Sequence, residues 1–421
     1  METQIRYPKQ KIILFENNIR YIVHGQGVFL FESINDSNKL EKCSFSILNN
    51  DNTDGLEITF QVNSIKVNRI STTDSYVDPN CRQGLSHLNG AYYWFSLDSH
   101  NQTFYAGIGE ARLETCLYKY KFEFTKDQDN ERKANIQFLE DLINIKIIKN
   151  IKPIRLLRDP ITENISLLVK NTNDLTMENV ANGKFMPRPN LSTMAQKLYD
   201  CIAGNKFILN TPDFPDFSKA IEYSIASKDG WCNKKLKEKS TEFNKDKPNT
   251  NETYLRITLG QNNGESPGIP YVMEIWPVAH YSPIHNHGSA EAIIRVLHGS
   301  INVSLFPFLC GDKVGVEPFG NVNFNKNDIT WISPTLNQTH QLKNLENNKS
   351  TCITIQCYMY DQENIKHYDY FDYIDDDGNI KQYEPDSDMD FIEFKKQMKL
   401  EWDNRPNKSI IERIIKFFRC L

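Results

Sequence analysis

The sequence predicts an α+β protein that is mostly β, in which a β-sandwich precedes a group of helices and a β-barrel. Three observations predict this fold class. Short apolar runs separated by Asn, Asp and Gly turns fill residues 1–125, the pattern of a sandwich. Residues 191–237 instead repeat apolar side chains at helical spacing. From residue 254 to about residue 358 strand-like runs return, as expected of a barrel.

The first region contains an aromatic hairpin. Its predicted strands, 91–97 and 103–109, flank the turn Asp98-Ser-His-Asn101, and another aromatic strand follows at 117–124. Aromatic side chains dominate β cores, so we interpret these residues as sandwich core. The stretch YYWFSLD…YAGIGEAR also resembles the β-sandwich domain named after farnesoic acid methyltransferase. We predict a sandwich at 1–150 and an irregular linker at 151–190.

The second region begins with helices expected at 191–203, 217–226 and 230–237. Strands expected at 254–259, 271–278, 292–297, 301–306 and 351–358 follow them. We therefore predict a helix-plus-barrel domain at 191–365. The remaining residues, 366–421, form an acidic and aromatic extension that ends in a basic amphipathic helix at 409–421. That helix either docks on the protein or contacts a membrane surface weakly.

Composition narrows the range of functions. The net charge of −5 over 421 residues gives no electrostatic reason to expect a nucleic-acid partner. No run of about 18 apolar residues occurs, so no transmembrane segment is expected. The N-terminal residues lack the apolar core and cleavage site of a signal peptide. The nine scattered cysteines are then expected to be reduced thiols, which predicts a cytoplasmic location.

Three histidines carry the chemistry. His285 and His287 are two residues apart, so in a strand both imidazoles point to one face and reach one ion. His340 is a third candidate ligand, and Glu291 is considered as a fourth. Three imidazoles suit Fe, Zn, Cu or Ni better than a hard cation. With Gly299, this pattern resembles the two-part metal motif of cupins, which implies a cupin (double-stranded β-helix) barrel.

Further residues extend this resemblance to one family. The 190–360 region resembles cysteine dioxygenase and related thiol dioxygenases in several motifs at shared spacing. The matching residues are Tyr254-Leu-Arg256, Trp276, His280, His285-Asn-His287, Leu297-His-Gly299, His340, Asn344 and Tyr358. The resemblance covers about 170 residues.

The resemblance implies a non-haem Fe(II) enzyme that oxidises a small thiol, L-cysteine above all, to its sulfinate with both atoms of O₂. The three histidines would hold the iron. Arg256 presents a planar fork suited to clamping a carboxylate. Tyr254 would support that carboxylate, and Tyr358 would donate a hydrogen bond to the substrate.

Two departures from the family stand out. Animal members have a Cys, crosslinked to the Tyr, where this chain has Ala292, so that crosslink is not expected here. The family's Ser-x-His-x-Tyr is here Thr354-Ile-Gln356-Cys-Tyr358. Gln cannot take a proton as His can, so the hydrogen-bonded tether of Tyr358 is not carried over from the family.

Two other functions remain open from the sequence. A different cupin metalloenzyme would use the three histidines with Glu291, holding Mn or Ni, although Glu291 can also pair with Arg295 or Arg256. A binding protein without catalysis would hold a ligand or partner in a degenerate barrel. His280 and His298 are expected to be structural histidines.

Overall fold

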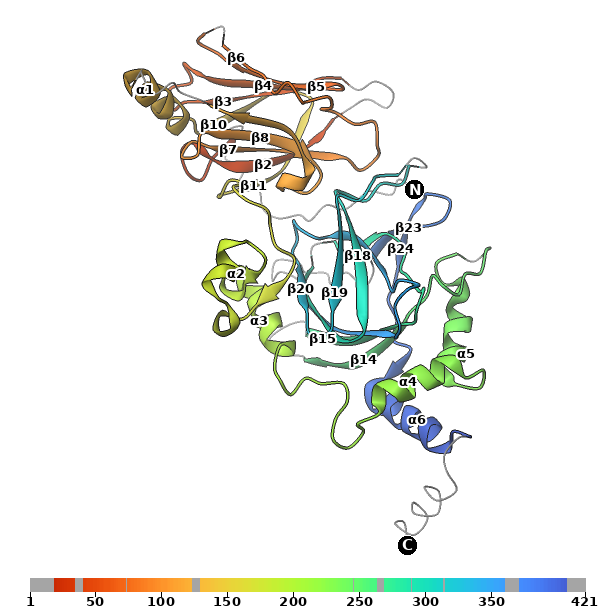
Figure 1. The fold of residues 1–421 in the computed structure, drawn as a ribbon. Helices are drawn as coiled ribbons and strands as arrows, with labels where there is room; N and C mark the ends of the chain where they lie inside the picture. Colours follow the sequence, from red (N-terminus) through yellow and green to blue (C-terminus); the bar gives the residue numbers. More distant parts are fainter. Residues whose placement is uncertain are drawn as a thin grey trace.

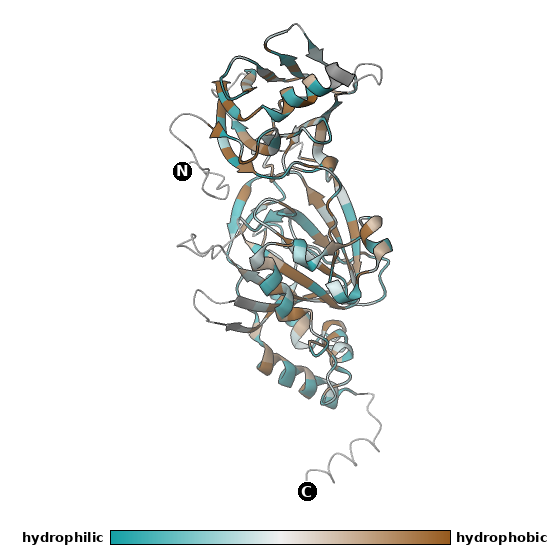
Figure 2. Ribbon diagram, turned by 90° about the vertical axis from the view of Figure 1, so that its left-hand side faces the viewer, coloured by the Kyte–Doolittle hydropathy of each residue, from teal (hydrophilic) through white to brown (hydrophobic). Residues whose placement is uncertain are grey.

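The structure is a computed structural model of the chain that describes residues 19–34, 41–72, 74–122, 129–244, 246–262, 269–288, 290–312, 315–359 and 371–406. Four large sheets build a sandwich and a barrel, and helices cover the far end of the barrel (Figure 1). Viewed from the side, these parts follow one another along the long axis, and apolar and polar residues alternate along their strands (Figure 2). The predicted fold class is confirmed: α+β, mostly β.

Two antiparallel sheets form the N-terminal sandwich. The first has the order β1 (Ile19–Arg20), β10 (Asn144–Lys149), β3 (Cys43–Leu48), β4 (Gly55–Gln61), β5 (Ser64–Arg69) and β6 (Ser75–Tyr76). The second has the order β11 (Ile151–Leu157), β2 (Gln26–Ser33), β7 (Tyr92–Asp98), β8 (Thr103–Ile108) and β9 (Cys116–Lys121). The predicted aromatic hairpin is confirmed, since β7 pairs with β8. Of the short apolar runs predicted as strands in the first region, the one at 11–14 lies outside the described residues.

Aromatic side chains fill the space between these two sheets. Phe45 of β3 stacks on Phe95 of β7 at 4.5 Å, and Phe95 stacks on Phe104 of β8 at 5.8 Å. All three are fully buried, which confirms the interpretation of the aromatics as core. The charged run at 125–133 is predicted from the sequence to be a link or a solvated turn, and this prediction is wrong for its second half, because helix α1 (Asp129–Glu140) begins within it.

A short irregular region joins the two halves of the protein. It holds the parallel pair β12 (Val169–Lys170) and β13 (Met186–Pro187) and helix α2 (Met177–Ala181). It also holds the single 3₁₀ turns η2 (Thr172–Asp174) and η3 (Arg188–Asn190). Two further 3₁₀ turns lie elsewhere, η1 (Leu113–Thr115) in the sandwich and η4 (Lys239–Thr241) after α5 (Trp231–Glu238). Strand β11, in the stretch predicted as linker, pairs with β2 and so belongs to the sandwich.

The three predicted helices before the barrel are present as α3 (Thr193–Ile202), α4 (Phe217–Ala226) and α5 (Trp231–Glu238). Ser192 caps α3 by accepting a hydrogen bond from the Ala195 N–H at 3.0 Å. The apolar stripe of α3, including the fully buried Leu198 and Ile202, packs on strands β17 and β22 of the barrel. These helices therefore close the outside of one barrel sheet.

The barrel consists of two six-stranded sheets. One has the order β20 (Ile329–Ile332), β17 (Glu291–His298), β22 (Cys352–Met359), β15 (Ile269–Trp276), β14 (Leu255–Asn262) and β25 (Met389–Asp390). The other has the order β19 (Gly320–Asn325), β18 (Ser300–Phe306), β21 (Thr339–Lys343), β16 (His285–Asn286), β23 (Phe371–Ile374) and β24 (Ile380–Tyr383). All neighbours pair antiparallel except β14 and β25, and strands alternate between the sheets along the chain as in a double-stranded β-helix.

The segment after residue 366 is built into the barrel. Strands β23 and β24 extend one sheet next to β16, β25 pairs with β14, and helix α6 (Phe391–Asn404) packs against α4. The predicted extension therefore supplies structural parts of the barrel. The amphipathic helix expected at 409–421 lies outside the described residues. Among the helices that the structure describes, none combines the length and apolarity that a membrane crossing requires.

Candidate metal centre and pocket

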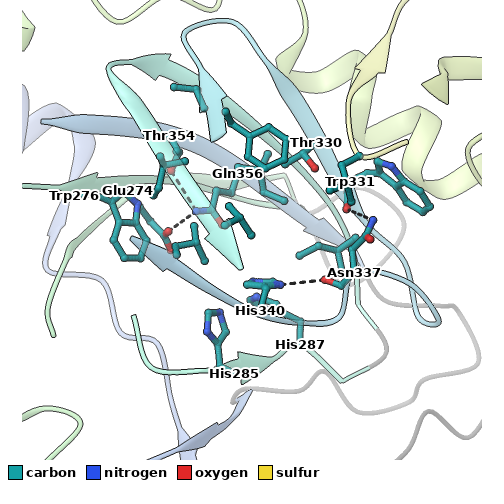
Figure 3. A pocket seen from close by; sticks show the side chains of 18 of the residues that line it. Glu274, Trp276, His285, His287, Thr330, Trp331, Asn337, His340, Thr354 and Gln356 are labelled. Atoms are coloured by element: carbon teal, nitrogen blue, oxygen red, sulfur yellow. Dashed lines mark hydrogen bonds between the residues drawn. The ribbon is translucent and has the colours of Figure 1, made fainter. Parts of the chain in front are cut away.

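One pocket occupies the inside of the barrel, between its two sheets. It contains about 770 Å³ of space not filled by atoms, counting the part open to solvent. Figure 3 shows His285, His287 and His340 close together at one end of it. Apolar residues of both sheets line the rest, among them Ile294, Val296, Ile301, Val303, Leu305, Phe324 and Leu342. A largely apolar chamber with few polar groups is the usual form of a small-molecule site.

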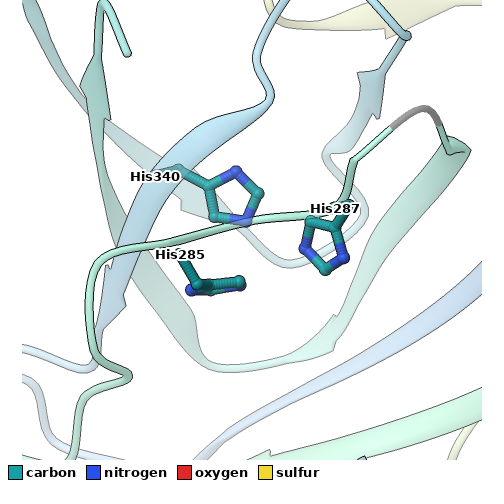
Figure 4. A group of neighbouring side chains, drawn as sticks. All are labelled: His285, His287 and His340. Atoms are coloured by element: carbon teal, nitrogen blue, oxygen red, sulfur yellow. The ribbon is translucent and has the colours of Figure 1, made fainter. Parts of the chain in front are cut away.

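The three predicted metal ligands converge in this pocket (Figure 4). Strands β16 and β21 run antiparallel with His285 directly opposite His340, and His287 follows two residues after His285. One candidate ligand nitrogen from each imidazole lies within 4.8 Å of the others. Within the described residues this is the only group of three or more His, Cys, Asp or Glu side chains that converges in this way.

Backbone carbonyls fix the orientation of two of these rings. His285 Nδ1 lies 3.0 Å from Pro283 O, and His340 Nδ1 lies 3.0 Å from Asn337 O. A carbonyl oxygen only accepts, so each Nδ1 carries the proton and leaves the Nε2 lone pair available. Such a hydrogen bond on the second ring nitrogen is the usual support of a metal-bound histidine.

Burial keeps the imidazoles neutral. Removal from water lowers the pKa of His285 to about 3, with a further contribution from His340. Burial also lowers the pKa of His340 to about 4 and that of His287 well below its ordinary value. Neutral nitrogen donors are what a divalent transition metal binds, and three of them leave coordination positions for other ligands. The donor set therefore fits a metal ion.

Arg256 faces the same pocket and is paired with an acid that the sequence analysis did not identify. Arg256 on β14 stands opposite Glu274 on β15 in the strand register, and its Nη1 donates to Glu274 Oε1 at 3.3 Å. Burial opposes the charge of Arg256, but Glu274 raises the pKa of that guanidinium. Burial raises the pKa of Glu274, while Arg256 and Gln356 act in the opposite direction. The pocket thus holds an ion pair.

Strand β22 continues this polar chain. Thr354, Gln356 and Tyr358 alternate along the strand, so all three side chains face the pocket. The Gln356 amide donates to Glu274 and, at 3.3 Å, to Thr354 (Figure 3). Its oxygen accepts the hydroxyl proton of Tyr358. Tyr358 therefore has a hydrogen-bonded tether, although it could not be carried over from the family: an amide oxygen is the acceptor where the family has a histidine.

Tyr254 and Trp276 form one wall of the pocket. Their rings stack at 4.2 Å, and both side chains are buried. The fully buried Asn344 donates to the Trp276 carbonyl at 2.8 Å and so holds the end of β15. Of the residues in the matching motifs, Tyr254 and Trp276 therefore line the pocket, and Asn344 supports the strand that carries Trp276.

The remaining acid and histidines lie apart from this centre. Glu291 is buried at the start of β17, but it neither joins the converging histidines nor lines the pocket. His280 Nδ1 lies 2.9 Å from the Thr253 carbonyl, and His298 Nε2 lies 3.3 Å from Glu222. Both agree with the structural role expected of these histidines.

Phe371 is another pocket residue that the sequence analysis missed. It begins β23, in the segment predicted as an extension, and its ring centre lies 4.8 Å from that of His285 and 5.6 Å from that of His287. An apolar ring at this place narrows the space beside the histidines and excludes water from it. No local sequence signal distinguishes Phe371 from any other strand aromatic.

Comparison with known proteins finds partial structural likenesses at low sequence identity. No protein-family model matches the chain. Similar solved structures include an L-ribose isomerase from Acinetobacter sp. DL28 in complex with L-ribose (14% identity, 25% of this chain, 59% of that chain, TM-score 0.20). They also include the cupin domain of Schizosaccharomyces pombe Cnp3 (12% identity, 27% of this chain, 74% of that chain, TM-score 0.21). A cupin superfamily protein from Desulfitobacterium hafniense DCB-2 is a further one (11% identity, 26% of this chain, 79% of that chain, TM-score 0.19). The chain spans about three fifths of that isomerase's length.

Proposed function

We propose that this protein is a non-haem iron dioxygenase that converts a small thiol, L-cysteine above all, to its sulfinic acid. The observation that carries the proposal is the convergence of three neutral imidazoles with Arg256 and the Tyr358 hydroxyl in one pocket. In the reaction RSH + O₂ → RSO₂H, the sulfur is oxidised and both oxygen atoms of O₂ enter the product. No other substrate atom changes.

His285, His287 and His340 would hold the metal through their Nε2 atoms. Fe(II) in this site would supply one-electron chemistry with O₂ and would favour the thiolate form of the substrate. The carbonyls of Pro283 and Asn337 keep two of the rings in the tautomer that this requires. Apolar walls and Phe371 limit the access of water to the sulfur.

The ion pair of Arg256 and Glu274 supports a zwitterionic substrate. Cysteine carries a carboxylate and an ammonium group on one carbon atom, and the pair offers one complementary charge to each. The planar guanidinium suits the carboxylate, and the Glu274 carboxylate suits the ammonium group. Gln356 keeps Glu274 in place by donating to its second oxygen. Both ends of cysteine would then be oriented before the sulfur reacts.

Tyr358 would act as a hydrogen-bond donor at the reacting end of the substrate. Its ring centre lies 5.4 Å from that of His287, next to the proposed metal. Since the hydroxyl already donates to Gln356, it would exchange this bond for one to the substrate or share the proton between them. A donor that is held in place before the reaction costs little reorganisation when charge develops.

The test is oxygen uptake by protein loaded anaerobically with Fe(II) and supplied with cysteine, 3-mercaptopropionate or cysteamine. We expect O₂ consumption matched one to one by the sulfinate of cysteine, identified by mass spectrometry with ¹⁸O₂ as two labelled atoms. His340→Ala is the matched inactive control. Bound iron without any uptake would contradict the proposal and favour another cupin metalloenzyme or a binding protein.

A further inference from the structure

A carboxylate from the sandwich reaches the loop that carries a metal-site histidine. Glu110 follows β8 of the sandwich and is almost completely buried, at 1% exposure. Its Oε2 accepts the Asn337 N–H and its Oε1 accepts the Gln338 N–H, both at 2.8 Å. These two residues lie in the loop between β20 and β21, just before His340. The two halves of the protein therefore meet at the candidate metal centre.

The peptide group between Asn337 and Gln338 is hydrogen-bonded at both ends. Its N–H donates to Glu110, and its C=O accepts the Nδ1–H of His340 at 3.0 Å. A carboxylate on the N–H side draws the peptide proton and increases the negative charge of the carbonyl oxygen, because hydrogen bonds in a chain polarise one another. The carbonyl then binds the His340 proton more strongly, which makes Nε2 a better donor to a metal.

We propose that Glu110 is a positioning residue for the metal centre, acting on His340 through the 337–338 peptide. In metalloproteins a carboxylate often contacts the histidine directly, whereas here one peptide group stands between them. The proposal requires a metal on the three histidines. It does not depend on which thiol, or which reaction, the protein serves.

Arg112 of the sandwich holds the other side of this loop. It is 2% exposed, lies 3.6 Å from Glu110 and donates to the Asn337 side chain at 2.9 Å. Asn337 has a φ of +62°, a backbone conformation that a fixed side chain helps to maintain. Burial raises the pKa of Glu110 to about 7, against Arg112 and the two N–H groups. Both Glu110 oxygens accept N–H bonds, which is the arrangement of the anion.

The same loop also reaches the segment of a second metal ligand. The Gln338 side chain donates to the Ala290 carbonyl at 3.0 Å, three residues after His287. Glu110 holds the backbone of Gln338, so a shift of the loop would be transmitted to both histidines. His285 lies on the strand paired with that of His340, but its Nδ1 partner is the Pro283 carbonyl and not the 337–338 peptide. This difference provides an internal reference for the test.

The packing of the two halves keeps Glu110 at this position. Its backbone N–H donates to Pro307 of the barrel at 2.9 Å. The neighbouring Gly109 has a φ of +76°, and a Cβ there would lie 2.3 Å from the Pro307 oxygen. Beyond Pro307, the barrel residues Phe308 and Cys310 enter the apolar core of the sandwich. This close packing of the sandwich on the barrel holds the Glu110 side chain in place.

The experiment uses the full chain loaded with Zn(II), at about pH 8 so that Glu110 is ionised. Zn(II) affinity is measured by competition with a chelator, and the Nδ1–H resonances of His340 and His285 by NMR with ¹⁵N-labelled histidine. The variant is Glu110→Gln, which keeps the shape but turns one acceptor into a donor that faces an N–H group. Glu114→Gln, which alters the partly exposed partner of Arg112, is the matched control.

We expect Glu110→Gln to weaken Zn(II) binding about tenfold and to move the His340 resonance upfield while the His285 resonance stays. Glu114→Gln should change neither. Unchanged affinity with an unchanged His340 resonance would overturn the proposal, and so would equal movement of both resonances, the result of a general loss of packing. If Glu110→Gln does not fold, the wild-type protein still tests the proposal. Its His340 Nδ1–H resonance should lie downfield of the His285 Nδ1–H resonance. The reverse order would contradict the proposal. A wild type that binds no Zn(II) would instead refute the metal site itself.

Discussion

Tyr358 donates its hydroxyl proton to the amide oxygen of Gln356, two residues earlier on β22. The same amide donates from its nitrogen to Glu274, which in turn pairs with Arg256. One glutamine therefore links the proposed hydrogen-bond donor of the reaction to the ion pair that is proposed to bind the substrate. A leucine would break both links, and a histidine would keep an acceptor for Tyr358.

We expect Gln356→Leu to lower kcat at least about tenfold with the iron content unchanged, because Tyr358 loses the acceptor that orients it. Tyr358→Phe should cost as much or more, and the double variant little beyond the worse single one, since the two residues act as a unit. Gln356→His is the matched control and should retain more activity than Gln356→Leu. Steady-state kinetics on iron-loaded protein measure all four. Full activity of Gln356→Leu would show that Tyr358 needs no tether.

The ion pair of Arg256 and Glu274 predicts that Arg256→Ala and Glu274→Gln change the substrate preference in opposite directions. Arg256→Ala should raise the KM for cysteine roughly tenfold, the loss expected for one charge-assisted hydrogen bond, and change that for cysteamine, which has no carboxylate, much less. Glu274→Gln should raise the KM for both amines and lower it for 3-mercaptopropionate, because Arg256 loses its competing partner. The surface variant Glu222→Gln is the control. Equal effects of Arg256→Ala on all three thiols would rule out the carboxylate clamp.

The strand register explains why Glu274 was missed. In the sequence it is one charge inside an apolar strand, VMEIW, two residues before Trp276 and therefore on the same face. Only the pairing of β14 with β15 places it opposite Arg256, and long-range register is not encoded in either strand alone. The HxH pattern of His285 and His287 could be recognised because it is local in the sequence, whereas only the pairing of β16 with β21 places His340 opposite His285.

Local patterns also account for what was and was not predicted in the fold. The helical stripe and capping serine of α3 and the run of aromatic residues in β7 are strong short-range signals. Strand β16 has two residues, too few for a periodic pattern, and β23 has four residues in a segment of mixed acidic and aromatic residues. Such strands form because neighbouring strands pair with them. The contact of Glu110 with the loop before His340 joins residues 227 and 228 positions apart, beyond any motif.

Removal of single side chains should separate metal ligands from bystanders. We expect His340→Ala to bind little iron, because two imidazoles hold a divalent ion far less tightly than three. Glu291→Gln should bind as much iron as the wild type, since Glu291 does not lie with the histidines. Metal analysis of protein dialysed after Fe(II) loading, with circular dichroism to verify folding, measures both. Loss of iron from a folded Glu291→Gln would place that carboxylate in the metal centre.

Glu252 makes stability depend on pH in a direction that can be tested. Burial, with repulsion from Asp376 and Asp375 in the turn between β23 and β24, raises the pKa of Glu252 to about 7. Since this lies above the value in the unfolded chain, the folded state binds more protons, and stability is lost as pH rises through about 7. Glu252→Gln should therefore be more stable than the wild type near pH 8, by about 1–2 kcal/mol after allowance for solvent screening. Near pH 4 the two proteins should not differ, because the Glu252 carboxyl is then mostly protonated in the folded and in the unfolded state.

Urea unfolding at both pH values measures this, with the exposed Glu238→Gln as control. An equal difference at both pH values would mean that Glu252 acts through packing and not through its charge.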